Sequence, residues 1–229
     1  MKVIYCLLVA GCITFTGAAQ TYLVKKIVPG AVQVSGKGDS RGWGQANVLT
    51  HFVYPWDSAA PPATSFAALW DGEWLYLLYR VKDDSVIVPV KKNDKKEVGA
   101  SDRVEIFLTT NPTLTPYYCL ELDALARVLD YTASYYRKMD YDWQWPRGQL
   151  IVKSSPTPDG YVVEAAISIR SLKELGLLKN GRLLAGLFRA ENMGVVNGRA
   201  DLRWISWVRP TSSKPDFHIP SAFGVLVLQ

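Results

Sequence analysis

The sequence has few of the residues that build metal, redox and disulfide chemistry. It contains three cysteines and two histidines in 229 residues, and Cys6 and Cys12 both lie within the first twenty positions. Without that segment Cys119 remains alone, which excludes an internal disulfide. Zinc motifs are missing, and no Cys-x-x-Cys-His haem attachment sequence occurs. The fold must therefore rest on its hydrophobic core.

Strong charge and long apolar runs are also lacking. The net charge of +5 comes from 26 basic and 21 acidic residues, and the densest basic stretch, residues 91–96, is interrupted by Asn93 and Asp94. No nucleic-acid signature accompanies it, so we expect no nucleic-acid partner. No apolar run reaches the roughly 20 residues of a membrane span. Serine-hydrolase and phosphate-loop motifs are missing, and the scattered acidic residues make a glycoside hydrolase a weak alternative.

The first nineteen residues have the composition of an export signal. Lys2 is followed by an apolar stretch over residues 3–15 and by the small residues Gly17, Ala18 and Ala19. This pattern predicts a signal peptide over residues 1–19, a folded domain over 20–229, and a secreted or periplasmic protein. A second interpretation remains open, because residues 9–12 resemble a bacterial lipoprotein box that would place a lipid on Cys12.

Short segments rich in β-branched, aromatic and Leu residues dominate the rest of the chain. Turn residues such as Asp71-Gly72 and Asn180-Gly181 separate them, which is typical of an all-β sandwich. One short helix is expected over residues 168–175, capped by Ser168 and ended by Gly176. We predict strands over residues 73–81, 103–109, 117–122, 127–131, 149–154, 161–167, 183–190, 202–207 and 223–228.

Four segments carry a more specific signal when they are taken in order. They are Leu69-Trp70-Asp71-Gly72-Glu73-Trp74 with the strand after it, Asp102-Arg103-Val104-Glu105-Ile106-Phe107, Asp159-Gly160-Tyr161-Val162-Val163-Glu164, and Trp204-Ile205-Ser206-Trp207 with Phe217-His218-Ile219-Pro220. Together they span about residues 30–229. In this order they resemble the family 9-like carbohydrate-binding modules, which are related to the DOMON-like group.

The resemblance implies an antiparallel, jelly-roll-like β-sandwich that binds sugars without altering them and often accompanies polysaccharide-degrading enzymes. Modules of this type hold a sugar between two aromatic rings. Phe217 falls at one ring position, and Glu105 coincides with a carboxylate that accepts sugar hydroxyls. Residues 99–101 are Gly-Ala-Ser where the second ring is expected, and the basic residue expected on strand 117–122 is missing. We expect Arg189 to supply that charge.

An aromatic segment, residues 135–145, provides further candidates for ligand contact. Trp143 and Trp145 are expected either to stack on a sugar or to pack over the sheet, and one of them is a candidate for the missing ring. His218 is a candidate polar partner. Glu105 and Glu164 interrupt apolar strands, so each needs a buried partner, and Arg189 is the expected one.

Three alternatives stay open at this point. The chain could have kept the fold and become a structural or protein-interaction module, a possibility that the missing ring favours. Haem binding, known among DOMON-like relatives, has only His51, His218, Met139 and Met193 as ligands after the signal segment. Calcium is reported for some members of the family, and the candidate ligands here are Asp71, Asp83 and Asp84.

Overall fold

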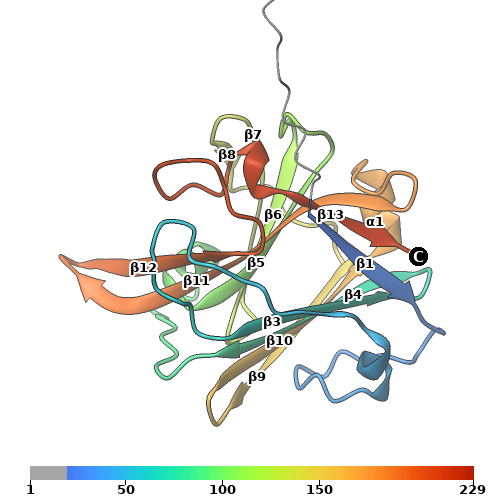
Figure 1. Cartoon of the computed structure of the whole chain (residues 1–229), viewed down its shortest axis with the longest axis horizontal. Helices are drawn as coiled ribbons and strands as arrows, with labels where there is room; N and C mark the ends of the chain where they lie inside the picture. Colours follow the sequence, from blue (N-terminus) through green and yellow to red (C-terminus); the bar gives the residue numbers. More distant parts are fainter. Residues whose placement is uncertain (1–19) are drawn as a thin grey trace, which may run out of the picture.

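The computed structural model describes residues 20–229, and strands are its main regular elements (Figure 1). The signal segment and Cys12 lie outside the described residues. The strands are β1 (Thr21–Lys26), β2 (Val48–Leu49), β3 (Thr64–Trp70), β4 (Trp74–Lys82), β5 (Arg103–Thr109), β6 (Tyr117–Asp123), β7 (Val128–Ser134), β8 (Lys138–Asp140), β9 (Leu150–Thr157), β10 (Gly160–Ser168), β11 (Arg182–Val196), β12 (Arg199–Ser206) and β13 (Gly224–Leu228).

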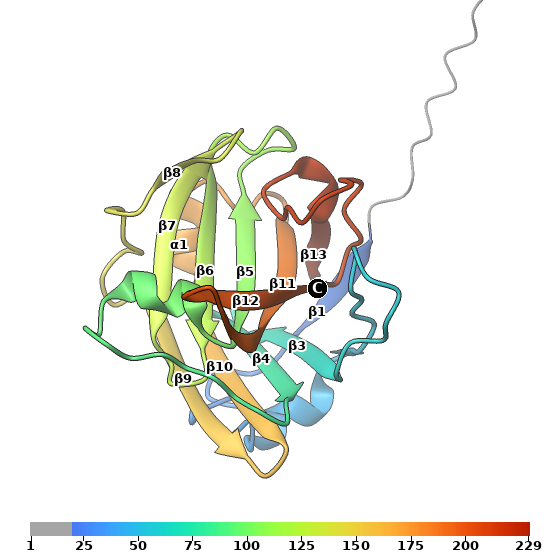
Figure 2. The ribbon, with the colours of Figure 1, turned by 90° about the vertical axis from the view of Figure 1, so that its left-hand side faces the viewer.

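These strands form two sheets joined along one edge. The larger sheet has the order β8-β7-β6-β5-β11-β13-β1, with β12 also paired to β11, and the smaller sheet has the order β3-β4-β10-β9, with β2 paired to β3. Figure 2 shows β7, β6, β5 and β11 side by side above the smaller sheet, whose strands cross beneath them. The two layers make the expected sandwich.

Strand β1 is the exception to antiparallel pairing. Its first four residues pair in parallel with β13, and its last two, Lys25 and Lys26, pair in parallel with Leu69 and Trp70 of β3. One short strand thus passes from the larger sheet to the smaller one. This junction closes one side of the sandwich.

The alternation of side chains along each strand determines what is buried between the sheets. On β10, Tyr161, Val163, Ala165 and Ile167 point into the central core, where they meet Val104 and its neighbours from β5. The other face of β10 carries Val162, Glu164 and Ala166. Every residue of β10 is nevertheless buried, so the outer face of the smaller sheet is covered as well.

Each outer face has its own cover. Segment 27–46, which contains the short 3₁₀ helix η1 (Arg41–Gln45), lies on the smaller sheet and buries Ile27, Val32 and Trp43 against it. On the larger sheet, the loop that leads to β13 brings Phe217 and Ala222 onto β5, β6, β7 and β11. The second cover is incomplete, and the gap in it is described below.

Glu164 fixes the cover of the smaller sheet. Its side chain is fully buried, and its Oε2 accepts hydrogen bonds from the backbone N–H groups of Ser35 at 2.9 Å and Gly36 at 2.5 Å. Its Oε1 accepts from Nε1 of Trp43 at 2.7 Å. The expected partner, Arg189, does not contact it. Backbone and indole donors replace a countercharge, because the cover loop reaches this face and Arg189 does not.

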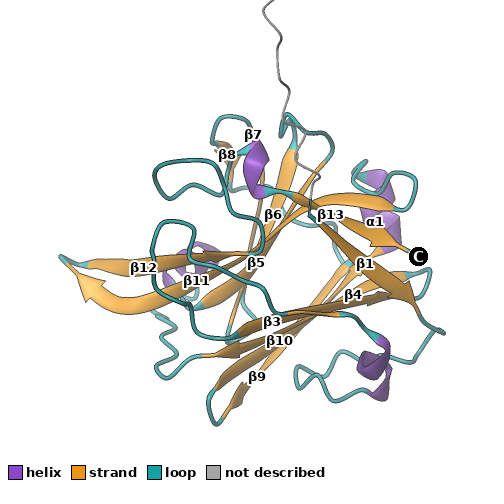
Figure 3. Ribbon diagram, viewed as in Figure 1, coloured by secondary structure: helices purple, strands orange, loops and turns teal. Residues whose placement is uncertain are grey.

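Most of the predicted elements are present within a few residues. The only α-helix among the described residues, α1 (Ile169–Glu174), is capped by Ser168, whose side chain accepts from the N–H of Ser171. Figure 3 colours it purple, as it does the short 3₁₀ helices, which include η2 (Lys95–Ala100) and η3 (Pro220–Ala222). The prediction missed β1, β2, β3 and β8. Strand β3 is buried on both faces and therefore lacks the alternation that marks a strand.

Among residues 20–229 there is no helix that is both long and apolar enough to cross a membrane.

Replacing Glu164 with Ala should lower the free energy of unfolding by about 3 kcal/mol, because it leaves several buried donors without an acceptor. Urea unfolding of both proteins measures the change. Glu174→Ala, an exposed carboxylate on α1, is the control and should change stability by less than about 0.5 kcal/mol. An equal loss in the two variants would contradict the role assigned to Glu164.

Candidate functional site

The outer face of the larger sheet carries a buried charged cluster. Arg103 and Glu105 alternate with core residues on β5, so both side chains point away from the sandwich interior. Strand β6 places Glu121 directly opposite Glu105. The Nε of Arg103 lies 2.9 Å from Oε1 of Glu105 and 2.6 Å from Oε2 of Glu121. One guanidinium therefore serves two carboxylates, and all three side chains are buried.

This arrangement favours a proton on the cluster. Burial raises the pKa of the Glu105 carboxyl to about 8, although the charge of Arg103 opposes the shift, and the nearby charge of Glu121 adds to it. Two carboxylates next to one cation leave an excess negative charge in a poorly solvated place, and a proton removes it. At neutral pH Glu105 can thus donate a hydrogen bond as well as accept one.

A small cavity of about 70 Å³ opens above this cluster. Its floor is the charged cluster with Phe107, and its sides are residues from three other parts of the chain, all half-buried or exposed except the buried Phe217. These are Arg137 from the turn between β7 and β8, Trp204 from β12, and Pro215, Asp216, Phe217 and His218 from the loop before β13. The cavity is the gap in the cover of the larger sheet.

Asp216 holds the rim of the cavity together. Its carboxylate pairs with Nη1 of Arg137 at 2.9 Å and accepts a hydrogen bond from the hydroxyl of Tyr136 at 2.6 Å. The same carboxylate accepts from the backbone N–H of His218 at 2.9 Å. The loop before β13 is thus tied to the turn between β7 and β8. The two segments are far apart in the sequence.

His218 forms a polar wall that carries no charge at neutral pH. Its ring stacks on Phe107 with centroids 5.1 Å apart, and its Nδ1 lies 3.0 Å from the hydroxyl of Tyr117. Burial lowers the pKa of the imidazole to about 4, and the positive charge of Arg137 contributes to the shift. A neutral imidazole offers one donor and one acceptor.

Phe217 and Trp204 supply the aromatic part of the cavity. Phe217 is only 5% exposed and stacks face to face on Phe188, with centroids 4.1 Å apart. Trp204 stands perpendicular to Phe217 at 5.7 Å and is half-buried. The guanidinium of Arg103 lies 5.5 Å from the Trp204 ring. Of the two rings, Trp204 therefore has the more accessible surface.

Arg189 lies on the opposite face of the same sheet. Strand β11 pairs Phe188 with Glu105 and Arg189 with Val104, so Arg189 shares the face that points into the sandwich. It is fully buried, with its Nη2 2.9 Å from Asp83 and 3.5 Å from Glu191. It is not the partner of Glu105 and does not line the cavity. The cation that pairs with Glu105 is Arg103 instead.

Trp143 and Trp145 also lie away from the cavity. Trp145 is 6% exposed, and its Nε1 donates to the hydroxyl of Ser171 on α1 at 3.2 Å. Trp143 is half-buried and packs on Tyr118 at 5.0 Å and on Trp145 at 5.8 Å. Tyr118 points into the central core, whereas Tyr117 and Cys119 point to the cavity face. The two tryptophans cover an open side of the sandwich interior.

Two of the three candidate calcium ligands, Asp71 and Asp83, are committed to other partners. Asp71 accepts from the N–H groups of Glu73 and Trp74 and from the hydroxyl of Tyr76 at 2.8–2.9 Å. Asp83 pairs with Arg189. Within the described part of the chain no three Asp, Glu, His or Cys side chains converge closely enough to hold a metal ion. These residues therefore do not fit a calcium site.

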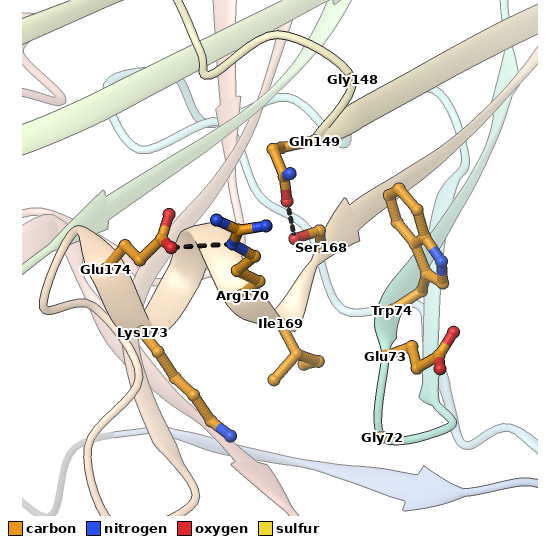
Figure 4. Close-up of a pocket in the computed structure, with 10 residues that line it drawn as sticks. All are labelled: Gly72, Glu73, Trp74, Gly148, Gln149, Ser168, Ile169, Arg170, Lys173 and Glu174. Carbon is orange, nitrogen blue, oxygen red and sulfur yellow. Dashed lines mark hydrogen bonds and ion pairs between the residues drawn. The ribbon is translucent and has the colours of Figure 1, made fainter.

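A larger cavity of about 600 Å³ lies at the end of the smaller sheet (Figure 4). The half-buried Trp74 ring stands on one side of it, and the side chains of α1 stand on the other. Four of its polar side chains satisfy one another, because Arg170 pairs with Glu174 at 2.8 Å and Ser168 donates to Gln149, and its other charged residues, Glu73 and Lys173, are exposed. No buried charge faces it. The smaller cavity over Arg103 is therefore the better candidate site.

The sequence identified part of this site. Glu105, Phe217 and His218 meet at the cavity, while Arg103, Glu121, Arg137, Trp204 and Asp216 were not among the candidates. The alternation of Arg103, Glu105 and Phe107 along one strand is a signal for a shared face. No sequence signal links Asp216 to Arg137, because loops far apart in the chain bring them together.

The raised pKa of Glu105 predicts how stability depends on pH. Folding tightens proton binding to this carboxyl, so its contribution is complete below the unfolded pKa of 4.5 and is lost as the pH rises toward about 8. Glu105→Gln cannot ionise, and its free energy of unfolding should fall less between about pH 5 and about pH 8, by on the order of 1 kcal/mol. Chemical denaturation across this range measures the difference.

Asp102 contributes to the same pH range in both proteins, because burial raises its pKa to about 7. The test is therefore the difference between wild type and Glu105→Gln, not the slope of either protein alone. Parallel curves would show that Glu105 keeps its ordinary pKa in the folded protein.

Comparison with known proteins shows which proteins this chain resembles in sequence and in fold. Endo-1,4-beta-xylanase C of Paenibacillus barcinonensis is 27% identical over 205 residues, which are 89% of this chain but only 17% of that enzyme's length. A solved structure of a proposed carbohydrate-binding protein from Bacteroides uniformis ATCC 8492 superposes with a TM-score of 0.73 at 18% identity, covering 93% of this chain and 100% of that one.

Two further structures share the fold. They are complexes of a family 9 carbohydrate-binding module of Caldicellulosiruptor kristjanssonii with glucose and with cellotriose. Their TM-scores are 0.57 and 0.58, with 20% and 18% identity, 92% of this chain covered in each case, and 96% and 94% of the other chain. The model of the family described as "Carbohydrate family 9 binding domain-like" matches residues 34–229, most of the chain, and the protein therefore belongs to this family.

Proposed function

We propose that this protein binds a carbohydrate at the cavity over Arg103 without altering it chemically. The observation that carries the proposal is the buried ion-paired cluster of Arg103, Glu105 and Glu121 at the bottom of an opening walled by Trp204. A buried charged cluster at an opening is costly unless it serves a ligand or a fold requirement. A sugar matches this opening, because a sugar has hydroxyl groups around apolar C–H patches and the opening has polar side chains beside an aromatic ring.

The side chains around the opening have complementary roles toward such a ligand. The carboxyl of Glu105 and the carboxylate of Asp216 accept hydrogen bonds from hydroxyl groups, while Arg137 donates them. The Trp204 ring provides an apolar surface for C–H groups. His218 adds a neutral polar group. This combination suits a neutral sugar better than an anion. The opening has at least as many acidic side chains as basic ones, so its charge does not favour a negative ligand.

The size of the cavity favours the end of a sugar chain. Pockets that enclose a whole small ligand occupy roughly 300–1,000 Å³, whereas this cavity measures about 70 Å³. Only one edge of a pyranose ring with its hydroxyls fits inside, and the remainder rests on the rim. A terminal sugar has such a free edge. An internal sugar has linkages at both ends, which limit how deeply it can enter.

The relatives suggest the substrate class. One structural relative is complexed with glucose and cellotriose, and the matched curated relative is a xylanase. We therefore place the ligand among plant-type β-linked polysaccharides and their oligosaccharides, and the protein alongside enzymes that degrade them. The export signal predicted from residues 1–19 is consistent with a secreted or periplasmic location, with lipid attachment at Cys12 as the alternative.

A catalytic role is not supported by the cluster. Glycoside hydrolysis requires one carboxyl that protonates the leaving group and a second that acts as a base or nucleophile. Here Glu105 and Glu121 are both paired to the same guanidinium, and both are buried beneath the opening. Their chemistry is suited to holding hydroxyl groups in place.

Replacing Trp204 with Ala should weaken sugar binding by about 1–3 kcal/mol, because it removes the accessible aromatic wall. A glycan array on residues 20–229, repeated with and without calcium, identifies the ligand, and isothermal titration calorimetry measures the affinity of both proteins. Trp143→Ala is the matched control and should bind as tightly as wild type, since Trp143 lies away from the cavity.

Two results would contradict the proposal. Equal binding by Trp204→Ala and wild type would move the site elsewhere. A correctly folded wild type that retains no glycan would favour the structural or protein-interaction role, to which the narrow cavity and the ring-free residues 99–101 also point.

A further inference from the structure

Two exposed tyrosines stand beside the cavity at the turn between β7 and β8. Tyr135 is 48% exposed and Tyr136 is 52% exposed, and both are among the large side chains least covered by the fold. Their rings meet edge to face with centroids 5.3 Å apart. Large aromatic side chains that remain in water next to an opening are typical of ligand contact surfaces.

The pair is anchored to the cavity wall. The hydroxyl of Tyr136 donates to Oδ2 of Asp216 at 2.6 Å, and the neighbouring Arg137 pairs with Oδ1 of the same carboxylate at 2.9 Å. Asp216 and Arg137 both line the cavity. The backbone N–H of Tyr135 donates to the carbonyl of Leu114 at 2.9 Å, which fixes the turn from the other side. The turn and the Tyr136 side chain are therefore held at the edge of the cavity before any ligand arrives, and the Tyr135 ring packs against Tyr136.

The cavity itself cannot accommodate a second sugar. Phe217 has one face covered by Phe188 and lies 5.4 Å from Trp56, so its ring offers little free surface. No aromatic ring occurs at residues 99–101, and the available volume is about 70 Å³. Accessible aromatic surface beyond Trp204 is found outside, on the tyrosine pair. A chain that leaves the cavity on this side passes over it.

We infer that Tyr135 and Tyr136 form an outer subsite that stacks on the second and third sugars of a β-linked oligosaccharide whose terminal sugar occupies the cavity. This inference rests on the proposed function. The subsite adds affinity only for a ligand longer than one sugar, because a single sugar does not reach beyond the lip. Chain length thus becomes the property that the two tyrosines recognise.

The experiment compares glucose, cellotriose and xylotriose as probes, using isothermal titration calorimetry on wild type and on Tyr135→Ala/Tyr136→Ala. Wild type should bind at least one trisaccharide about tenfold more tightly than it binds glucose, which corresponds to about 1.4 kcal/mol. The double variant should lose most of this preference, while its affinity for glucose stays within about twofold of that of Tyr136→Phe, which lacks only the hydroxyl that contacts Asp216. Tyr136→Phe keeps the ring and should retain most of the preference.

The control is Ile151→Ala, which removes an exposed apolar side chain, 41% exposed, from β9 of the smaller sheet. It should behave as wild type in every titration. Thermal unfolding confirms that all variants fold, which we expect because the replaced rings are exposed.

The outcomes separate the two proposals. A preference for trisaccharides that is unchanged in the double variant overturns the outer subsite and leaves the cavity proposal intact. Wild type that binds neither trisaccharide overturns the outer subsite for β-linked chains, and the cavity proposal falls with it only if the glycan array also shows no bound sugar. Equal losses for glucose and trisaccharide in the double variant would also overturn the subsite, because the tyrosines would then act through Asp216 on the cavity.

Discussion

Arg103 gives two buried carboxyl groups on neighbouring strands a shared cation. Glu105 and Glu121 are direct partners across β5 and β6, and like charges in that relation repel. The guanidinium of Arg103, two residues along the same face, lies within ion-pair distance of both. Without it two buried carboxyl groups would face each other with no cation beside them.

Each outer face of the sandwich carries buried carboxyl groups, and the groups that compensate for their burial differ between the two faces. On the smaller sheet, Glu164 receives backbone and indole donors from a loop that covers it completely, so its carboxylate is sealed. On the larger sheet the countercharge comes from Arg103 of the sheet itself. The loop before β13 therefore does not have to cover the carboxyl groups completely. The first arrangement produces a closed structural face. The second leaves the side chains of Arg103, Glu105 and Glu121 lining the floor of an opening.

The aromatic residues divide along the same lines. Trp43 packs under the cover of the smaller sheet, and Trp143 and Trp145 cover a side of the central core. Trp204, together with Tyr135 and Tyr136, remains at or beside the opening. Trp and Tyr combine an apolar ring with a polar group, so composition alone assigns them to neither role. Their place relative to the charged cluster makes the distinction.

The sequence by itself determined the β-sandwich, most strand positions, the short helix between Ser168 and Gly176, and the family, because these depend on local alternation, turn residues and capping. It also indicated Glu105, Phe217 and His218. Only the tertiary structure decided that Arg103, and not Arg189, reaches Glu105. The register of β5 against β11 turns these two arginines to opposite faces. Pairing register and the meeting of Tyr136 with Asp216 depend on contacts between distant segments, and no local pattern encodes them.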